Sequence, residues 1–252
     1  MSKSLAEIKN HLKQASYEEI LDVIDLYLDD DRTSVQKEII SAKKRYDKYL
    51  AELRRLEVMS EYEDKYSDYE FICGIDEVGR GPLAGPVMAG AVILPKGSKI
   101  LYINDSKKLS ESKREELFIQ IKEEAVSWAI GVADHTRIDE INILQATFEA
   151  MRSAISSLEK APSLLLNDAV TIPDISIKQV PIIKGDAKSK SIAAASIIAK
   201  VTRDHFMQDM DALYPEYNFA SNKGYGSSAH IEALKKYGPC PIHRMSFIGN
   251  FI

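Results

Sequence analysis

Cysteine is scarce in this sequence, and its scarcity excludes several classes of protein. Only Cys73 and Cys240 occur among 252 residues, and they form no CxxC pair. A fold held together by disulfides is therefore not expected, nor is a cysteine zinc site. Because Cys73 lies within an apolar run, the pattern favours two buried structural thiols in a reducing compartment.

Long apolar runs and a secretion signal are also missing. No apolar run is long enough to cross a bilayer, and the N-terminus lacks a cationic stretch followed by an apolar one. We expect a soluble, cytoplasmic and monomeric protein with no membrane partner.

An excess of positive charge is the third absence. The net charge is −5, which argues against a protein that coats nucleic acid without regard to sequence. Residues 1–70 hold 12 Lys and Arg against 17 Asp and Glu, so residues 71–252 are neutral. A neutral domain that concentrates acids at one site must have basic surface elsewhere. Hydrophobic residues make up 45% of the chain, enough for a sizeable core.

The front of the chain, residues 1–65, is predicted to form a helical N-terminal extension. Ser4 and Glu7 fit a capping box at the start of a short helix. Apolar residues then recur at helical spacing in residues 17–28 and in a long charged segment, residues 34–62. A helical hairpin packed on the main domain and a dedicated binding arm are both compatible with this pattern.

An acidic, tyrosine-rich linker is expected at residues 61–70, after which strands alternate with helices. We expect strands at residues 71–75, 87–94, 128–133, 164–166 and 180–183. We expect helices at residues 112–124, 137–158, 189–210 and 227–237. The short turn between the first two strands favours an antiparallel hairpin. The whole pattern predicts an α/β domain with a mixed β-sheet flanked by helices.

The chain is organised around residues 71–86, FICGIDEVGRGPLAGP. An apolar strand leads into Asp76 and Glu77, and the turn Gly79–Arg80–Gly81 follows. GRGPLA formally matches a dinucleotide-binding fingerprint, but that site needs a helix next, and a proline and an apolar β-rich run follow instead. The glycines suit close approach of backbone amides to a ligand, and Arg80 is a suitable phosphate partner. An ordinary solvated loop is the alternative.

Two later strands also end in acids, at Asp168 and Asp186. Strand ends of open α/β sheets are frequent site positions, and carboxylates are hard ligands for Mg²⁺ or Mn²⁺. Converging carboxylates without His or Cys resemble a two-metal phosphodiester site. Alternatively, each acid caps a helix or closes a turn, Asp186 in particular. Neighbours on a strand point to opposite faces, so Asp76 and Glu77 share ions only if the chain bends or a backbone carbonyl contributes.

These motifs carry a family resemblance. From about residue 71 to residue 247 the sequence resembles bacterial ribonuclease HII, the type 2 ribonuclease H family. The resemblance implies an RNase H-like fold and cleavage of the RNA strand of RNA–DNA hybrids. It also implies incision 5′ of single ribonucleotides embedded in duplex DNA, by two-metal-ion hydrolysis leaving 3′-hydroxyl and 5′-phosphate ends. The matching motifs, in order, are GIDEVGRGPLAGPV, NDSKKLS, RIDEINILQATFEAM, KGDAKSKSIAAASIIAKVTRD and NKGYGSSAHIEALKKYGPCPIHRMSF.

The same resemblance implies residue roles. The catalytic and metal-binding acids would be Asp76, Glu77, Asp168 and Asp186, with two Mg²⁺ or Mn²⁺ ions. Tyr225 would recognise the junction between ribonucleotide and DNA. The other substrate-binding positions would be Gly79, Arg80 and Gly81 at sugar and phosphate, and Lys107, Lys108, Lys188, Ser189 and Ser191 at phosphates.

Differences from the family pattern and alternative functions limit what the resemblance implies. The tail FIGNFI lacks the Gln-led spacing of a sliding-clamp peptide, so no clamp partner is expected. The catalytic domain would span residues 71–252 with a C-terminal helical segment, and the helical front argues against the type 3 relative. His243 is expected to have a structural role. Another RNase H-like nuclease and a hybrid-binding protein without catalysis are the rival functions.

Overall fold

The computed structural model describes residues 3–252 and divides the chain between Val58 and Met59 into two compact units. The first unit contains three helices, α1 (Leu5–Gln14), α2 (Ile20–Asp25) and α3 (Thr33–Met59), the last of which reaches the boundary. Their apolar faces share one small core, built by Ile8, Leu12, Ile20, Val23, Ile24, Tyr27, Val35, Ile39 and Ala42. The helix expected over residues 17–28 is shorter than predicted because the amides of Tyr27 and Leu28 bond carbonyls three residues back, in turns, instead of four residues back.

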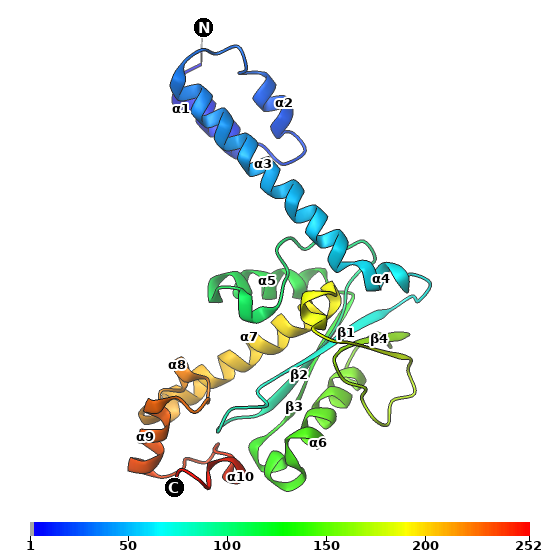
Figure 1. Ribbon diagram of the computed structural model, residues 1–252, viewed down its shortest axis with the longest axis vertical. Helices are drawn as coiled ribbons and strands as arrows, with labels where there is room; N and C mark the ends of the chain where they lie inside the picture. Colours follow the sequence, from blue (N-terminus) through cyan, green and yellow to red (C-terminus); the bar gives the residue numbers. More distant parts are fainter. Residues whose placement is uncertain (1–2) are drawn as a thin grey trace. The chain divides into compact units, whose positions relative to one another are not determined.

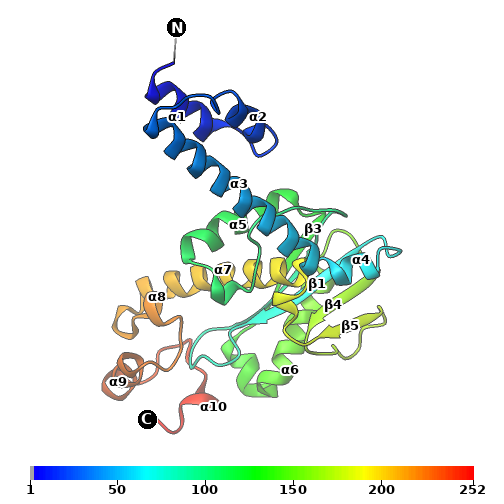
Figure 2. The ribbon, with the colours of Figure 1, turned by 45° about the horizontal axis from the view of Figure 1, so that its top comes forward.

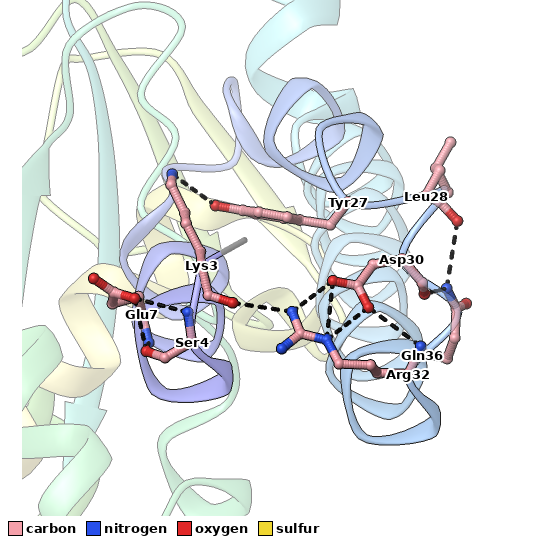
Figure 3. Close-up of polar contacts among 8 residues, drawn as sticks. All are labelled: Lys3, Ser4, Glu7, Tyr27, Leu28, Asp30, Arg32 and Gln36. Atoms are coloured by element: carbon pink, nitrogen blue, oxygen red, sulfur yellow. Dashed lines mark hydrogen bonds and ion pairs between the residues drawn. The ribbon is translucent and has the colours of Figure 1, made fainter. Parts of the chain in front are cut away.

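Polar contacts close the first unit (Figure 3). The predicted capping box is confirmed, because Ser4 N donates to Glu7 Oε2 (2.7 Å) and Glu7 N donates to Ser4 Oγ (3.3 Å). Arg32 pairs with Asp30 (2.6 Å) and donates to the carbonyl of Lys3 (3.0 Å). The guanidinium therefore ties the start of α1 to the turn before α3.

The second unit is built on a five-stranded mixed sheet of order β3-β2-β1-β4-β5. β1 pairs antiparallel with β2, as predicted, and β2 with β3, whereas β1, β4 and β5 are parallel. The fold class predicted from the sequence is confirmed. The strands are β1 (Ile72–Val78), β2 (Val87–Ile93), β3 (Ser127–Ala133), β4 (Leu164–Asp168) and β5 (Gln179–Ile182).

Helices cover both faces of this sheet (Figures 1 and 2). α6 (His135–Ser156) packs on β2 and β3, and α7 (Lys190–Leu213) packs on β1 and β2 from the other side, with α5 (Glu111–Glu124) beside α7. α7 approaches closely because the strands present glycines to its backbone. A Cβ on Gly74 would lie 2.0 Å from the Ser191 carbonyl carbon, and one on Gly90 would lie 2.4 Å from Ala195 O.

The C-terminal segment gathers at the far end of α7 (Figure 1). Its residues Tyr217, Phe219, Ala233, Cys240 and Ile242 pack with Met207 of α7 and Ala84. Both cysteines are free and buried, as predicted. The helices here are α8 (Phe219–Asn222), α9 (Ser228–Tyr237) and α10 (Met245–Ile248).

The stretch predicted as a linker is folded onto the sheet instead. It contains the short helix α4 (Glu61–Lys65), and Tyr62, Tyr66 and Tyr69 pack against the apolar cluster that includes Ile72. The tyrosine rings cover apolar side chains that would otherwise face water, so residues 61–70 belong to the second unit. In residues 3–252, no helix is long and apolar enough to cross a membrane.

Candidate active site

The predicted acids meet at one edge of the sheet. β1, β4 and β5 run parallel, so their carboxyl ends share an edge, and the register pairs Ile75 with Asn167. Asp76 and Glu77 lie on β1 itself, because pairing with β2 extends this strand beyond the predicted end at residue 75. Asp168 ends β4, and Asp186 lies in the 3-10 helix that follows β5 (Gly185–Ala187).

Electrostatics show that these carboxylates influence one another. Burial raises the pKa of Asp76 well above its usual value, and the charges of Glu77 and Asp168 raise it further. Burial also raises the pKa of Glu77, Arg80 opposes this, and Asp168 adds to it. Three negative groups are thus held close together with little solvent, an arrangement that a bound cation would relieve.

The adjacent pair Asp76 and Glu77 sits on regular strand, paired with Gly90 and Ala89 of β2. Asp76 Oδ1 accepts from Glu77 N (2.8 Å), and Glu77 Oε1 lies 3.3 Å from Arg80 Nη1. No bend separates the two acids, yet both respond to the charge of Asp168.

Asp168 joins two of the strand ends. Its Oδ1 accepts from Gly185 N at 2.7 Å, which fixes the turn that carries Asp186. Burial raises the pKa of Asp186, and the negative charges of Asp105 and Asp168 raise it further. The loop after β5 is therefore held to the end of β4 by a direct hydrogen bond.

Asp105 is a fifth acid at this edge, which sequence reasoning missed. Its carboxyl shares a hydrogen bond with Asp186 and accepts from Lys107 N (2.9 Å). The local signal is the aspartate of NDSKKLS, which stands just before the two lysines predicted to bind phosphate, Lys107 and Lys108. Lys108 Nζ lies 3.7 Å from Asp105, and the charge of Lys107 lowers the pKa of Asp186, so both lysines stand near the acids.

Two buried serines also support the edge and were missed. Ser196 of α7 hydrogen-bonds Asp76, and its Oγ lies 2.9 Å from Ser106 Oγ. Since the Ser196 proton goes to Asp76, Ser106 donates to Ser196. The available signal was a hydroxyl within the otherwise apolar run SIAAASIIAK.

Ser189 and Ser191 do not face solvent. Ser189 Oγ donates to Glu63 Oε1 (2.6 Å) and accepts from Ile192 N (3.2 Å), and Ser191 N donates to the same Glu63 oxygen (2.9 Å). A carboxylate of α4 thus occupies the anion position at the start of α7, where negative charge is favourable. Lys188 is exposed.

The glycine turn and Tyr225 lie side by side. A Cβ on Gly81 would be 3.7 Å from Tyr225 Cε1, and Leu83 N donates to Gly224 O (2.8 Å). The Arg80 side chain and Tyr225 are both almost half exposed, at 43% and 45%. Since Arg80 also reaches Glu77, the turn connects Tyr225 with the acidic edge.

Two buried histidines hold the backbone of Tyr225. His230 Nδ1 donates to Tyr225 O (2.9 Å), so the neutral ring accepts at Nε2 from His243 Nε2 (2.9 Å). His243 Nδ1 then accepts from Cys240 N (2.9 Å). The chain of hydrogen bonds requires both rings to be neutral, and it confirms a structural role for His243.

The donor chemistry fits a hard divalent cation. The acidic groups described at this edge are all carboxylates, the hydroxyls of Ser106 and Ser196 lie beside them, and no His or Cys is among them. In the part of the chain described, no group of three or more His, Cys, Asp or Glu side chains is already arranged around a metal position. Asp76, Glu77, Asp168 and Asp186 would therefore hold an ion only with adjustment of their side chains.

Comparison with known proteins supplies the family. The family model described as Ribonuclease HII matches residues 73–250, and that of the Ribonuclease HII N-terminal domain matches residues 4–67. Ribonuclease HII of Lachnoclostridium phytofermentans is 60% identical over 250 residues, which cover 99% of this chain and 98% of that protein. Ribonuclease HII of Clostridioides difficile is 53% identical over 252 residues, covering 99% of each.

Solved structures share the fold. The ribonuclease H2 of Pyrococcus horikoshii OT3 has a TM-score of 0.58 at 28% identity, covering 70% of this chain and 93% of that one. RNase HII of Archaeoglobus fulgidus, solved as a complex with PCNA, has a TM-score of 0.57 at 25% identity, covering 69% and 94%.

The sheet, its acidic edge and these likenesses define a nuclease of the ribonuclease H class. The chain belongs to the ribonuclease HII family. It is an enzyme, and the family supports endonuclease activity on the RNA of RNA–DNA hybrids.

Proposed function

We propose that this ribonuclease H also incises duplex DNA on the 5′ side of single embedded ribonucleotides, leaving 3′-hydroxyl and 5′-phosphate ends. The observation that carries the proposal is the position of the Gly79–Arg80–Gly81 turn. It touches Tyr225 on one side and reaches the acidic edge through Arg80 and Glu77, 3.3 Å apart.

Recognition would rest on the sugar and the phosphate. A 2′-hydroxyl is what distinguishes RNA from DNA at one nucleotide, and it can be sensed by backbone groups without reading a base. An exposed tyrosine ring offers a surface for the adjoining nucleotide. The turn and Tyr225 supply both kinds of group within one short region.

The four acids would hold two divalent ions, Mg²⁺ or Mn²⁺. Such ions activate the attacking water and stabilise the leaving oxygen when bound. Asp168 keeps the Asp186 turn in place through Gly185, and Ser196 orients Asp76. Arg80 provides positive charge for a phosphate beside Glu77.

Incision of three matched duplexes tests the proposal. One strand carries a single ribonucleotide, a run of ribonucleotides or none, with Mg²⁺ or Mn²⁺ present. We expect cutting of the first two substrates, no cutting of all-DNA duplex, and loss of cutting in Asp76→Asn. Robust cutting by that variant would refute the metal assignment, and equal cutting of all-DNA duplex would refute recognition of the 2′-hydroxyl.

A further inference from the structure

Two fully buried arginines lie behind the Gly79–Arg80–Gly81 turn. Arg203 comes from α7, and Arg244 directly precedes α10; both are 0% exposed. Each guanidinium makes three hydrogen bonds, and every acceptor is a main-chain carbonyl. Arg203 binds the carbonyls of Pro86 (2.9 Å), Lys223 (2.9 Å) and Ala84 (3.1 Å); Arg244 binds those of Gly85 (2.9 Å), Arg80 (2.9 Å) and Gly79 (2.6 Å).

These carbonyls belong to the segments that form the proposed recognition region. In a trans peptide the C=O and the following N–H point in opposite directions. Because Arg244 holds the carbonyls of Gly79 and Arg80, the N–H groups of Arg80 and Gly81 face away from it. Neither amide donates a hydrogen bond within residues 3–252, and both residues are exposed. The turn therefore presents two free amide donors to solvent, next to Tyr225.

The nearby carboxylates of Asp204 and Asp139 act on Arg203 and Arg244, respectively, through their charge alone. No carboxylate forms an ion pair with either guanidinium across the described chain. Burial lowers the pKa of Arg203 to about 10 and that of Arg244 to about 9, so both remain protonated at neutral pH. Unpaired buried charge is costly, which makes a purely space-filling role a poor account of these residues.

The sequence of the turn is adapted to this arrangement. Gly79 has φ +88°, and a Cβ there would lie 2.3 Å from Arg203 Nε. The guanidinium fork, with its fixed geometry, matches several carbonyls at once in a way that a lysine ammonium does not. Gly79 leaves the space that the Arg203 side chain occupies, so the two residues depend on each other.

We infer that Arg203 and Arg244 are positioning residues for substrate recognition. Arg244 binds the carbonyls of Gly79 and Arg80 and so aims the free amides of the turn outward. Arg203 holds the flanking segments at Ala84, Pro86 and Lys223, which fixes the turn beside Tyr225. The charge of both arginines makes the turn attractive to the sugar–phosphate of a ribonucleotide. This inference rests on the proposed function, because it assigns the turn a ligand. It goes further by placing the origin of ribonucleotide preference in two side chains that do not touch the substrate.

The test separates geometry from charge by comparing Arg244→Lys with Arg244→Met. The readout is the Ki of an all-DNA duplex, as competitor, divided by the KM for the same duplex with one ribonucleotide, both with Mg²⁺. This ratio does not change when only part of the enzyme is active. Arg244→Lys keeps the charge but loses the fork, so we expect the ratio to fall by about tenfold or more while Ki stays within about twofold.

Arg244→Met also loses the charge. For it we expect the same fall in ratio together with a higher Ki and a weaker dependence of Ki on salt. Arg203→Lys repeats the geometric test through the segments that flank the turn and Tyr225, and it carries the experiment if an Arg244 variant does not fold. Arg137→Lys, in an exposed ion pair with Glu149, is the matched control and should leave the ratio unchanged.

Folded lysine variants with the wild-type ratio would overturn the inference. So would a proportional rise of KM and Ki in the lysine variants, because this would show a general loss of binding. A wild-type protein with a ratio near one would instead refute the proposed recognition of ribonucleotides, and the positioning role with it.

Discussion

Each carboxylate at the sheet edge is held by a different neighbour. Asp76 is held by a buried serine, Glu77 by Arg80, Asp168 by a main-chain amide and Asp186 by another acid, Asp105. Removing these neighbours would affect the carboxylates differently. Only in the contact between Asp105 and Asp186 do both groups carry the same sign of charge when ionised.

Replacing Asp105 with Asn tests this support. The amide can still accept from Lys107 N, but one negative charge next to Asp186 is lost. We expect the Mg²⁺ concentration that gives half-maximal activity on a hybrid to rise by about tenfold, as for residues that support metal ligands. Asp174→Asn, far more exposed, is the control. An unchanged Mg²⁺ requirement would contradict a role for Asp105.

The histidine pair makes stability depend on pH. Burial lowers the pKa of His243 from 6.5 to about 4, and burial also lowers that of His230. Between pH 6.5 and pH 4 the unfolded chain binds protons that the folded chain does not, so stability falls as pH falls through this window. We expect a loss on the order of 2–3 kcal/mol from His243 over that range.

Urea unfolding of wild type and His243→Gln at pH 7 and pH 4.5 measures this. Carboxylates contribute equally to both proteins, so the wild type should lose more stability than the variant between the two pH values. His205→Gln, at an exposed position, should behave as wild type. Parallel losses in wild type and His243→Gln would argue against a buried neutral pair.

At the residue scale, sequence reasoning found the acids that follow apolar strands, and it missed Asp105 and the side chains that only the fold brings to the site. Asp76, Glu77, Asp168 and Asp186 follow apolar strands, a pattern readable in one sequence. Ser196, Arg203 and Arg244 act through contacts with segments 90 to 165 residues away, which no local pattern reveals.

At the element scale, α7 determines where the site is. It covers β1 and β2 so closely that the strand glycines Gly74 and Gly90 leave no room for a side chain. Ser196, in the same helix, then meets Asp76. The first half of this helix, residues 190–199, is buried throughout.

Gly74→Ala tests this packing. Its Cβ would lie 2.0 Å from the Ser191 carbonyl carbon, so α7 or β1 must move. We expect a loss of about 1–3 kcal/mol in the free energy of unfolding, typical of overpacking, and lower kcat on a hybrid. Gly249→Ala meets no atom within 4 Å and is the control. Wild-type stability of Gly74→Ala would show that the helix is less tightly placed.

The ends of elements were harder to predict than their existence. β1 and β4 run on through their acids because neighbouring strands pair with them, a tertiary effect absent from local propensity. α6 and α7 begin close to where predicted, since Asp134 and Ser189 cap them.

At the scale of the whole molecule, the boundary between the units lies at Val58–Met59, before the tyrosine-rich stretch. The acidic composition of residues 61–70 predicted a linker. Composition alone does not reveal that the tyrosines of this stretch pack on an apolar surface of the second unit. Glu63 binds Ser189 and Ser191, so this stretch contributes to the start of α7. We propose that the catalytic unit includes residues 59–70.

Two truncations test that proposal. A chain beginning at Met59 should keep the stability of the second unit, whereas one beginning at Ser67 loses Glu63 and Tyr62. We expect the shorter chain to be less stable by about 2–4 kcal/mol, since hydrogen bonds to a charged group and apolar burial are both lost. Urea unfolding measures the difference, and equal stability would show that residues 59–66 are dispensable.

The contact between Glu63 and Ser189 also has a consequence for how the chain folds. It spans 126 positions in sequence, and the central strand β1 pairs with β4 across a similarly long stretch. Contacts of such separation form slowly, because a long loop must close before they contribute. A growing chain that has emerged only as far as β4 already carries Asp76, Glu77 and Asp168, but lacks Ser196 and Asp186. The acidic edge is therefore complete only after residues 185–196 have been added and α7 packs on β1 and β2.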